Sequence, residues 1–160
     1  MKLLLLSALF AAVHAVDYTF TANTTNMDYA GTSGAFFVTA WGYDGKLINF
    51  DLNALDKSAD TVSSMVFSSE VDLGALGCMV VRAGSTNAWM INDVTLASSS
   101  QDKELKGTNE NVNTAEGWLS SDTSEAGDKG ILSMMWCAEP RPSASTRVRR
   151  GESGYWGRSQ

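Results

Sequence analysis

The chain has 160 residues and carries 18 acidic against 12 basic side chains, a formal net charge of −6. This length suits a single domain with one hydrophobic core. The acidic balance argues against a nucleic-acid-binding protein, because binding to phosphates needs a basic surface.

Residues 1–15 are predicted to be a signal peptide. Lys2 gives a short basic start, Leu3–Val13 is an almost unbroken apolar run, and residues 12–15 (AVHA) are the small-residue end that a signal peptidase recognises. The run is too short for a membrane span; an N-terminal core helix is the alternative. Cleavage after residue 15 predicts a secreted, extracellular protein that begins at Val16.

The only histidine, His14, belongs to this predicted peptide. A Ser-His-Asp or Cys-His mechanism needs an imidazole, so the mature chain is predicted not to be a hydrolase of that kind. Its two cysteines cannot form a four-thiolate zinc site. Carboxylate-pair catalysis stays open as a mechanism, but no motif supports it. The sequence therefore predicts a protein that is not an enzyme, without catalytic residues.

From residue 16 to residue 138 the sequence predicts an all-β domain. The turn Tyr43-Asp44-Gly45 predicts a hairpin, because Asp-Gly supplies the positive φ that tight turns need. Ser98–Asn113 is polar and predicts a long loop. Gly, Ser, Asn and Asp clusters separate the strands at spacings typical of a β-sandwich. The predicted strands are Tyr18–Ala22, Ala35–Gly42, Lys46–Phe50, Val62–Phe67, Cys78–Ala83, Trp89–Leu96 and Gly130–Trp136.

Residues 139–160 are predicted to be a disordered tail, because they are rich in Pro, Ser and Arg and poor in apolar residues. The charge changes sign here: residues 139–160 hold five Arg against two Glu, whereas residues 16–138 hold sixteen acidic against six basic side chains. Arg147, Arg149 and Arg150 fit the Arg-x-x-Arg pattern of furin-like convertases, with one extra Arg. An unprocessed basic tail that is attracted to acidic surfaces is the alternative.

Several motifs resemble the PLAT (lipoxygenase-homology) domain. Residues 31–45 (GTSGAFFVTAWGYDG) are similar to its Gly-Thr-Asp, apolar strand, aromatic, Gly and acidic turn. Residues 71–74 (VDLG), the strand at 78–82 and residues 87–96 (NAWMINDVTL) are similar to its Asp-Leu-Gly, strand and Gly-Trp-Phe-Leu-Asp-x-Val-x-Val. Residues 116–119 (EGWL) stand for its closing Arg-Trp-Leu. The resemblance covers roughly residues 18–119 and departs from the family at Ser33, which replaces Asp, and at Ala88, which replaces Gly.

The resemblance implies an eight-stranded antiparallel β-sandwich that acts as a non-catalytic recognition module. Members of the family bind lipids, membranes or partner proteins, and some bind calcium. The function predicted for this chain is therefore a secreted binding module for a lipid or membrane surface or for an extracellular protein. The alternatives are an extracellular structural or matrix protein, whose acidic body binds mineral or a cationic partner, and a venom or defence effector.

Trp41, Tyr43 and Trp89 are the candidates for contact with such a ligand, because amphipathic rings near turns suit a membrane interface. Core packing is the alternative for each, and it is favoured for Trp89, which lies inside a strand.

No cofactor is predicted. Calcium needs six to eight oxygen ligands, for which Asp28, Asp44, Asp51 and Asp93 are the conceivable donors, but no spaced calcium motif is present and solvated surface carboxylates are the favoured alternative.

Two covalent features are also expected. Asn23 opens the acceptor tripeptide Asn-Thr-Thr for N-glycosylation, a pattern that also arises by chance. Cys78 and Cys137 are expected to form a disulfide near the core that ties the last strand to a central one, because a secreted chain meets an oxidising environment. Two free buried thiols are the alternative.

The processing sites yield a direct prediction. The secreted product should begin at Val16 and end near Arg150, without residues 151–160. Intact mass spectrometry of native material measures both ends, and a C-terminal Gln160 would contradict the convertase site.

Overall fold

The molecule is built from β-strands, each of which has one side facing the core and one side facing the solvent. The computed structural model describes residues 15–112, 114–122 and 131–138, and in them apolar side chains alternate with polar or exposed ones along most strands. This period of two lets each strand bury one face and leave the other in water. The strands are β1 (Val16–Thr24), β2 (Phe36–Gly42), β3 (Leu47–Asp51), β4 (Val62–Ser69), β5 (Leu76–Ala83), β6 (Trp89–Ser98), β7 (Leu105–Thr108), β8 (Trp118–Leu119) and β9 (Ser133–Cys137).

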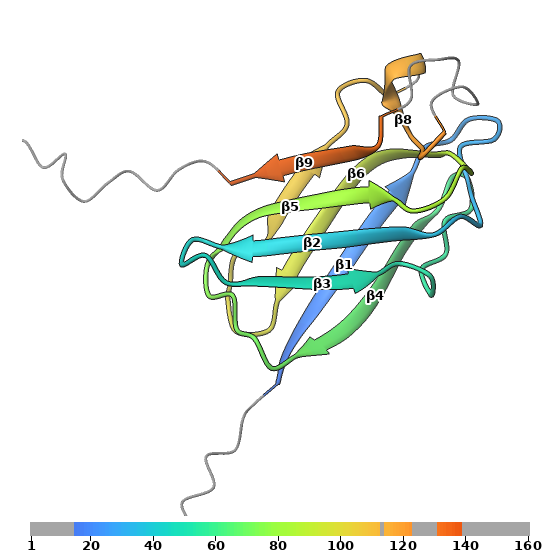
Figure 1. Cartoon of the computed structure of the whole chain (residues 1–160). Coiled ribbons are helices and arrows are strands. Elements are labelled where there is room, and N and C mark those ends of the chain that lie inside the picture. Colours follow the sequence, from blue (N-terminus) through green and yellow to red (C-terminus); the bar gives the residue numbers. More distant parts are fainter. Residues whose placement is uncertain (1–14, 113, 123–130, 139–160) are drawn as a thin grey trace, which may run out of the picture.

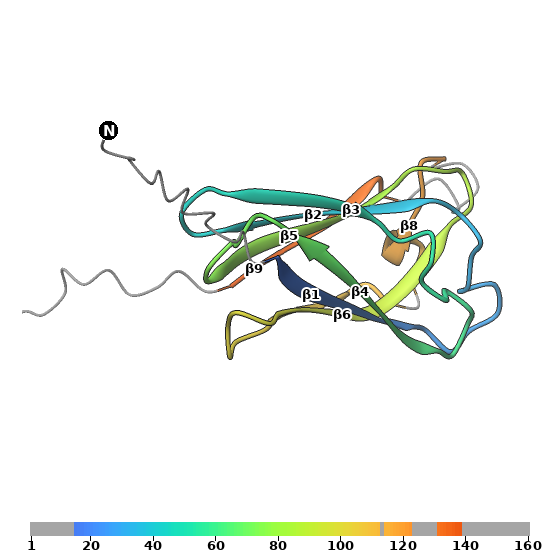
Figure 2. The ribbon, with the colours of Figure 1, turned by 90° about the horizontal axis from the view of Figure 1, so that it is seen from below.

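The strands form two stacked sheets (Figures 1 and 2). The first sheet has the order β4-β1-β6-β7, with the short β8 also paired to β6, and the second has the order β3-β2-β5-β9. Neighbouring strands in both sheets are antiparallel. The predicted all-β sandwich is therefore confirmed.

Aromatic side chains from both sheets fill the core between them. Phe36 and Trp89 lie edge to face with ring centroids 5.1 Å apart, and Tyr18 stacks on Phe67 at 5.4 Å. Such pairs stabilise the fold by roughly 0.5–1.5 kcal/mol each beyond the burial of their area. Two polar groups on these rings also find partners: the Trp89 Nε1 donates to Thr24 Oγ1 at 3.0 Å, and the Tyr18 hydroxyl donates to the Val71 carbonyl at 3.0 Å.

The hairpin predicted at Tyr43-Asp44-Gly45 joins β2 to β3. Gly45 has φ +82°, which favours glycine, and its amide donates to the Gly42 carbonyl. A Cβ on Gly42 would lie 1.9 Å from the Leu73 carbonyl oxygen, so only glycine lets the loop before β5 approach this closely.

The predicted disulfide is present. Cys78 of β5 and Cys137 of β9 face each other directly across the strand pair, with a Cα–Cα distance of 4.0 Å. It ties the last described strand to a central one, as expected. The expectation that both cysteines lie near the core is wrong: Cys78 is half-buried and Cys137 is exposed, because both occupy outward positions of their strands.

The segment predicted as one long loop contains β7. Its residues look polar, but Leu105 is buried, and the buried Asn109 donates from Nδ2 to the carbonyls of Ile91 and Gly117. This amide holds the following 3₁₀ turn, Ala115–Gly117, against β6. The predicted last strand is shifted to Ser133–Cys137, and the predicted signal peptide up to residue 14 and the basic tail lie outside the described residues.

The disulfide should stabilise the fold because it removes conformational freedom from the unfolded chain. With a sequence separation of 59 residues, replacing both cysteines by serine is expected to lower the free energy of unfolding by about 4 kcal/mol. Urea denaturation measures this value. Reduction of the wild-type protein should lower its free energy of unfolding by a similar amount and should leave that of the double variant unchanged. A decrease of less than ~1 kcal/mol would contradict the expectation.

Candidate binding surface

The candidate binding surface is the outer face of the second sheet, where large side chains such as Leu47 and Met135 are exposed. Strand register aligns its outward residues in three rows that cross β3, β2, β5 and β9. The row at the β2–β3 turn is Leu47, Trp41, Cys78 and Cys137; the middle row is Asn49, Thr39, Val80 and Met135; the far row is Asp51, Phe37, Arg82 and Ser133.

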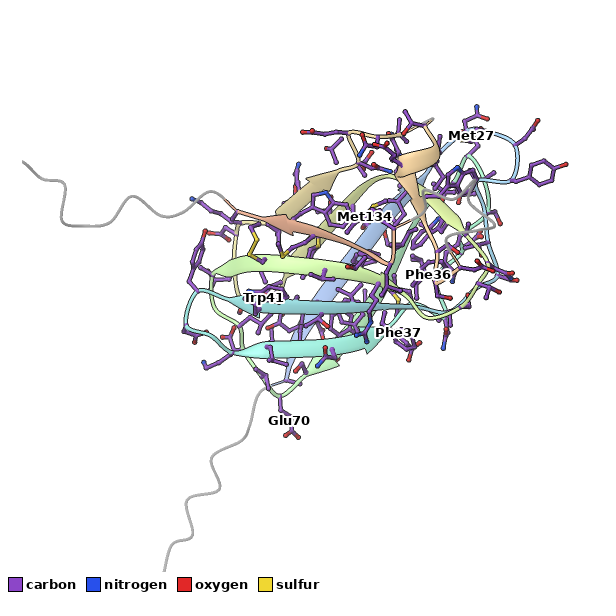
Figure 3. The ribbon with its side chains drawn as sticks, turned by 45° about the horizontal axis from the view of Figure 1, so that its top comes forward. Met27, Phe36, Phe37, Trp41, Glu70 and Met134 are labelled. Carbon is purple, nitrogen blue, oxygen red and sulfur yellow. A yellow bond between two sulfur atoms is a disulfide. The ribbon has the colours of Figure 1, made fainter. Side chains whose placement is uncertain are left out.

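Six apolar side chains of the first two rows form a continuous patch, here called the apolar face: Leu47, Trp41, Cys78, Cys137, Val80 and Met135. Leu47 is 55% exposed and Met135 is 63% exposed, while Trp41 is half-buried between its row neighbours. The Cβ atoms of residues directly opposite each other in an antiparallel pair lie about 5 Å apart, so the register makes these residues neighbours across the strands. Figure 3 shows Trp41 and Phe37 near opposite ends of β2.

The first sheet offers a clear contrast. Its outward positions on β1 and β6 are Asp17, Thr19, Thr21, Asn23, Asp93, Thr95 and Ala97. Hydroxyl, amide and carboxylate groups dominate there, and they bond to one another: Thr21 Oγ1 lies 2.7 Å from Ser64 Oγ. The exposed apolar side chains on this face of the first sheet, Val62 and Val66, lie on its edge strand β4. Exposed apolar area at the centre of a sheet is therefore found on the outer face of the second sheet, where it is available to a ligand.

Charges lie at the margins of this surface. At the turn, Lys46 Nζ lies 3.1 Å from Asp44 Oδ2, and hydrogen bonds from the Lys46 side chain and amide lower the pKa of Asp44. In the far row, Asp51 and Arg82 flank Phe37 in register. A shallow hollow of about 330 Å³ lies there, lined by Phe37, Thr39, Asn49, Phe50, Asp51 and Arg82.

The predicted contact residues have three different positions. Trp41 lies on the sheet face and not at a loop tip, and Tyr43 is exposed in the adjoining turn. Trp89 is fully buried, so its place among the contact residues is wrong and the core alternative is correct. The cause is that β6 is covered on both sides at its start: Trp89 packs on Phe36, while Met90 lies under the 3₁₀ turn at Gly117.

The four carboxylates considered for calcium do not come together. Asp44 lies in the turn before β3 and Asp51 at the other end of that strand, while Asp93 is on the outer face of the first sheet, where it accepts a hydrogen bond from Asn23 Nδ2 at 2.9 Å. Asp28 lies in the loop between β1 and β2. Among residues 15–112, 114–122 and 131–138, no group of three or more His, Cys, Asp or Glu side chains could hold a metal ion.

The glycosylation candidate Asn23 is half-buried near the end of β1, and the following Thr24 and Thr25 are buried. Its modification stays a prediction, because the structure does not test it. The convertase candidates Arg147, Arg149 and Arg150 lie outside the described residues.

Sequence reasoning missed most of the apolar face. Leu47, Val80 and Met135 share the outward parity of Trp41, but which strands are neighbours has to be known before the four residues form one surface. It also missed Tyr29, which is 90% exposed in the β1–β2 loop with φ +65°. Figure 3 shows Met27, from the same loop, at the other end of the molecule from Trp41.

Lys57 is the most deeply placed ionisable side chain near the second sheet. It is 5% exposed, and its Nζ donates to the carbonyls of Leu52 and Leu55 at 2.8 and 3.0 Å. Burial lowers its pKa below the ordinary 10.5, against the opposing attraction of Asp56 and Asp51. With both carbonyls bonded inside its own loop, this group serves the β3–β4 connection and not a ligand site.

Comparisons with known proteins give the fold. No protein-family model matches the sequence, and no curated protein matches it. A LOX deletion variant superimposes with a TM-score of 0.61 at 17% identity, over 78% of this chain and 16% of that one. Coral 8R-lipoxygenase, described with calcium activation through a C2-like domain, superimposes with a TM-score of 0.52 at 18% identity, over 76% of this chain and 16% of that one. Alpha toxin from Clostridium absonum superimposes with a TM-score of 0.55 at 15% identity, over 75% of this chain and 30% of that one.

These identities show the fold alone. The chain has the β-sandwich of the PLAT and C2-like domains, as its sequence resemblance predicted, and it spans 16% of the lipoxygenases and 30% of the toxin. Within the described residues, no helix is long and apolar enough to cross a membrane.

The buried Lys57 yields a pH prediction. Because its folded pKa lies below its unfolded one, the unfolded chain keeps a proton that the folded chain has lost as pH rises toward 10.5. This contribution therefore makes the free energy of unfolding rise between about pH 8 and about pH 10. Urea denaturation of the wild type and of Lys57→Met at both pH values isolates it: the difference between the two proteins should change with pH, and an unchanged difference would contradict the assignment.

Proposed function

We propose that this chain is a secreted, non-catalytic module that binds a lipid or membrane surface through the apolar face. The observation that carries the proposal is the outward row Leu47, Trp41, Cys78 and Cys137, with Met135 beside it, in which Leu47, Cys137 and Met135 are exposed and Trp41 and Cys78 are half-buried. Burial of apolar area stabilises contact by about 25 cal/mol per Å². An aromatic ring with a polar edge, such as Trp41, suits the boundary between headgroups and acyl chains.

The charge of the protein bears on which membranes it would bind. The formal net charge is −6, so anionic lipids repel the chain and attraction has to come from apolar contact. The proposed ligand is therefore a neutral, loosely packed lipid surface that exposes acyl chains.

Calcium is not part of the proposal. Calcium activation is stated for the coral lipoxygenase, whereas the four conceivable carboxylates of this chain lie on different parts of the described structure. Binding is expected to be independent of calcium.

Three features support secretion and the absence of catalysis. Residues 1–15 have the composition of a signal peptide, and β1 begins at Val16, the first residue after the predicted cleavage. The disulfide Cys78–Cys137 suits an oxidising compartment. The chain after residue 15 has no histidine for general base catalysis.

An extracellular protein is the second candidate ligand. Asp51 and Arg82 border Phe37 and the hollow beside it, and a charged rim around an apolar centre is typical of protein interfaces. A matrix role through the acidic body predicts salt-sensitive binding to calcium mineral instead.

The test is co-sedimentation with neutral phosphatidylcholine vesicles. Trp41→Ala is expected to weaken binding by roughly 1–2 kcal/mol, in proportion to the lost apolar contact, and to leave the melting temperature nearly unchanged. Tyr29→Ala removes an equally aromatic, more exposed side chain at the opposite end and is the matched control, with binding unchanged. Chelation of calcium should change neither result.

Two outcomes would contradict the proposal. One is a large loss of stability in Trp41→Ala with unaltered binding, which would make Trp41 a structural residue. The other is loss of binding in Tyr29→Ala alone, which would move the contact to the β1–β2 loop.

A further inference from the structure

The edge strand β4 stands apart from the other edges of the two sheets. It has eight residues, against five in β3, four in β7 and five in β9. Among the described strands it pairs only with β1, so its other side presents unpaired amide and carbonyl groups. Figure 2 looks at the molecule from the side on which β3 and β4 lie.

Soluble proteins protect such edges with lysine, proline, bulges or short strands. The other edges fit this pattern: β7 carries Lys106 and is also covered by Trp136, whose Nε1 donates to the Thr108 carbonyl at 2.9 Å, and β3 ends on Asp51. β4 has none of these devices. Residues 61–69 (TVSSMVFSS) are uncharged, and Val62 and Val66 are 70% and 62% exposed on its outer side.

We propose that β4 pairs with β4 of a second copy of this chain, antiparallel and across a two-fold axis at Ser64. The two copies must place outward residues opposite outward residues, because a slip of one residue would turn every side chain of one strand to the other face. The two-fold axis must therefore pass through a residue and not between two residues. With Ser64 on the axis, Val62 lies opposite Val66 of the second copy in two equivalent pairs. Cross-strand pairs of β-branched side chains stabilise a sheet.

The charges that flank β4 favour this register. With the axis at Met65, Asp60 of each copy would lie opposite Glu70 of the other, so that two pairs of like charges would face each other. With the axis at Val66, the apolar Val62 of each copy would lie opposite the charged Glu70 of the other. With the axis at Ser64, Asp60 instead comes to lie opposite Ser68, an uncharged side chain whose hydroxyl donates to Asp17 of its own copy. Strand β4 is thus complementary to itself, which an isologous dimer requires.

The dimer should be weak. Only the edge and two valines per copy are covered, less than a standard interface buries, which points to a dissociation constant on the order of 100 μM. Each copy has a formal net charge of −6, so the copies repel and added salt should strengthen the association.

If the proposed function holds, the geometry of this dimer would strengthen membrane binding, an inference that rests on that function. A two-fold axis perpendicular to the joined first sheets leaves both copies facing the same way, so both apolar faces point to one side. Two weak lipid contacts in one plane bind together far more tightly than either alone.

Sedimentation equilibrium of the purified protein tests the association without lipid. The wild type should dimerise, with a dissociation constant that falls several-fold from ~10 mM to ~500 mM salt. Val66→Lys should raise that constant by roughly tenfold or more, because a lysine on the edge blocks pairing. Val71→Lys adds the same charge in the loop after β4 and should leave the constant within about twofold.

Cysteine cross-linking tests the register. Under mild oxidation Ser64→Cys should form a covalent dimer through residue 64 of both copies, whereas Ser68→Cys, on the same exposed side of β4, should cross-link much more slowly. A protein that stays monomeric at ~1 mM, or equal cross-linking of the two variants, would overturn the proposal. Vesicle binding by a monomeric wild type would overturn this inference alone, and a dimer without vesicle binding would overturn only the proposed function.

Discussion

Two stacked sheets share one core, and each strand can send only alternate side chains into it. Strand β2 shows the constraint: Phe36, Val38 and Ala40 enter the core, so Phe37 and Trp41 have to point away from it. In the part of the chain that the structure describes, no further layer packs on the outside of the second sheet. Any apolar side chain at an outward position there stays at the surface, and the binding proposal depends on that consequence.

The disulfide and Trp136 hold this surface together at its β9 edge. Cys137 bonds to Cys78 on the outward side, and the next residue back, Trp136, reaches across to β7 of the other sheet. A Cβ on Gly107 would lie within 2.3 Å of the Trp136 ring, so the close contact between the two edges needs glycine there. One short strand is therefore fixed on both of its faces, which keeps Met135 in its place on the apolar face.

The sandwich could be predicted because its signals are local. Alternation in β1 and the Asp44-Gly45 turn need no knowledge of distant residues, and the cysteine pair follows from composition and an oxidising environment. The candidate site could be predicted only in part. Trp41 stands out as a single residue, but its neighbours Leu47 and Cys78 join it through strand register, which is a long-range property.

The errors have physical causes of the same kind. Trp89 was included because its strand could have exposed one side, yet its ring lies on the core side of β6 and packs on Phe36, while the 3₁₀ turn at residues 115–117 covers the opposite side, which carries Met90. β7 was missed because a four-residue strand holding Lys106 and Gly107 has too few apolar residues to show alternation. The calcium candidates are not an error of this kind and stay a hypothesis: Asp28 and Asp44 lie in loops, whereas Asp51 and Asp93 lie in strands of different sheets.

The central claim is that the outside of the second sheet touches lipid. The most direct measurement is the loss of amide NMR signal when phosphatidylcholine vesicles carry a paramagnetic lipid. The account predicts that the loss is concentrated at Leu47, Trp41, Val80 and Met135 and is small at Thr21 and Thr95 on the first sheet. Loss centred on the β1–β2 loop around Tyr29, or on the first sheet, would contradict it.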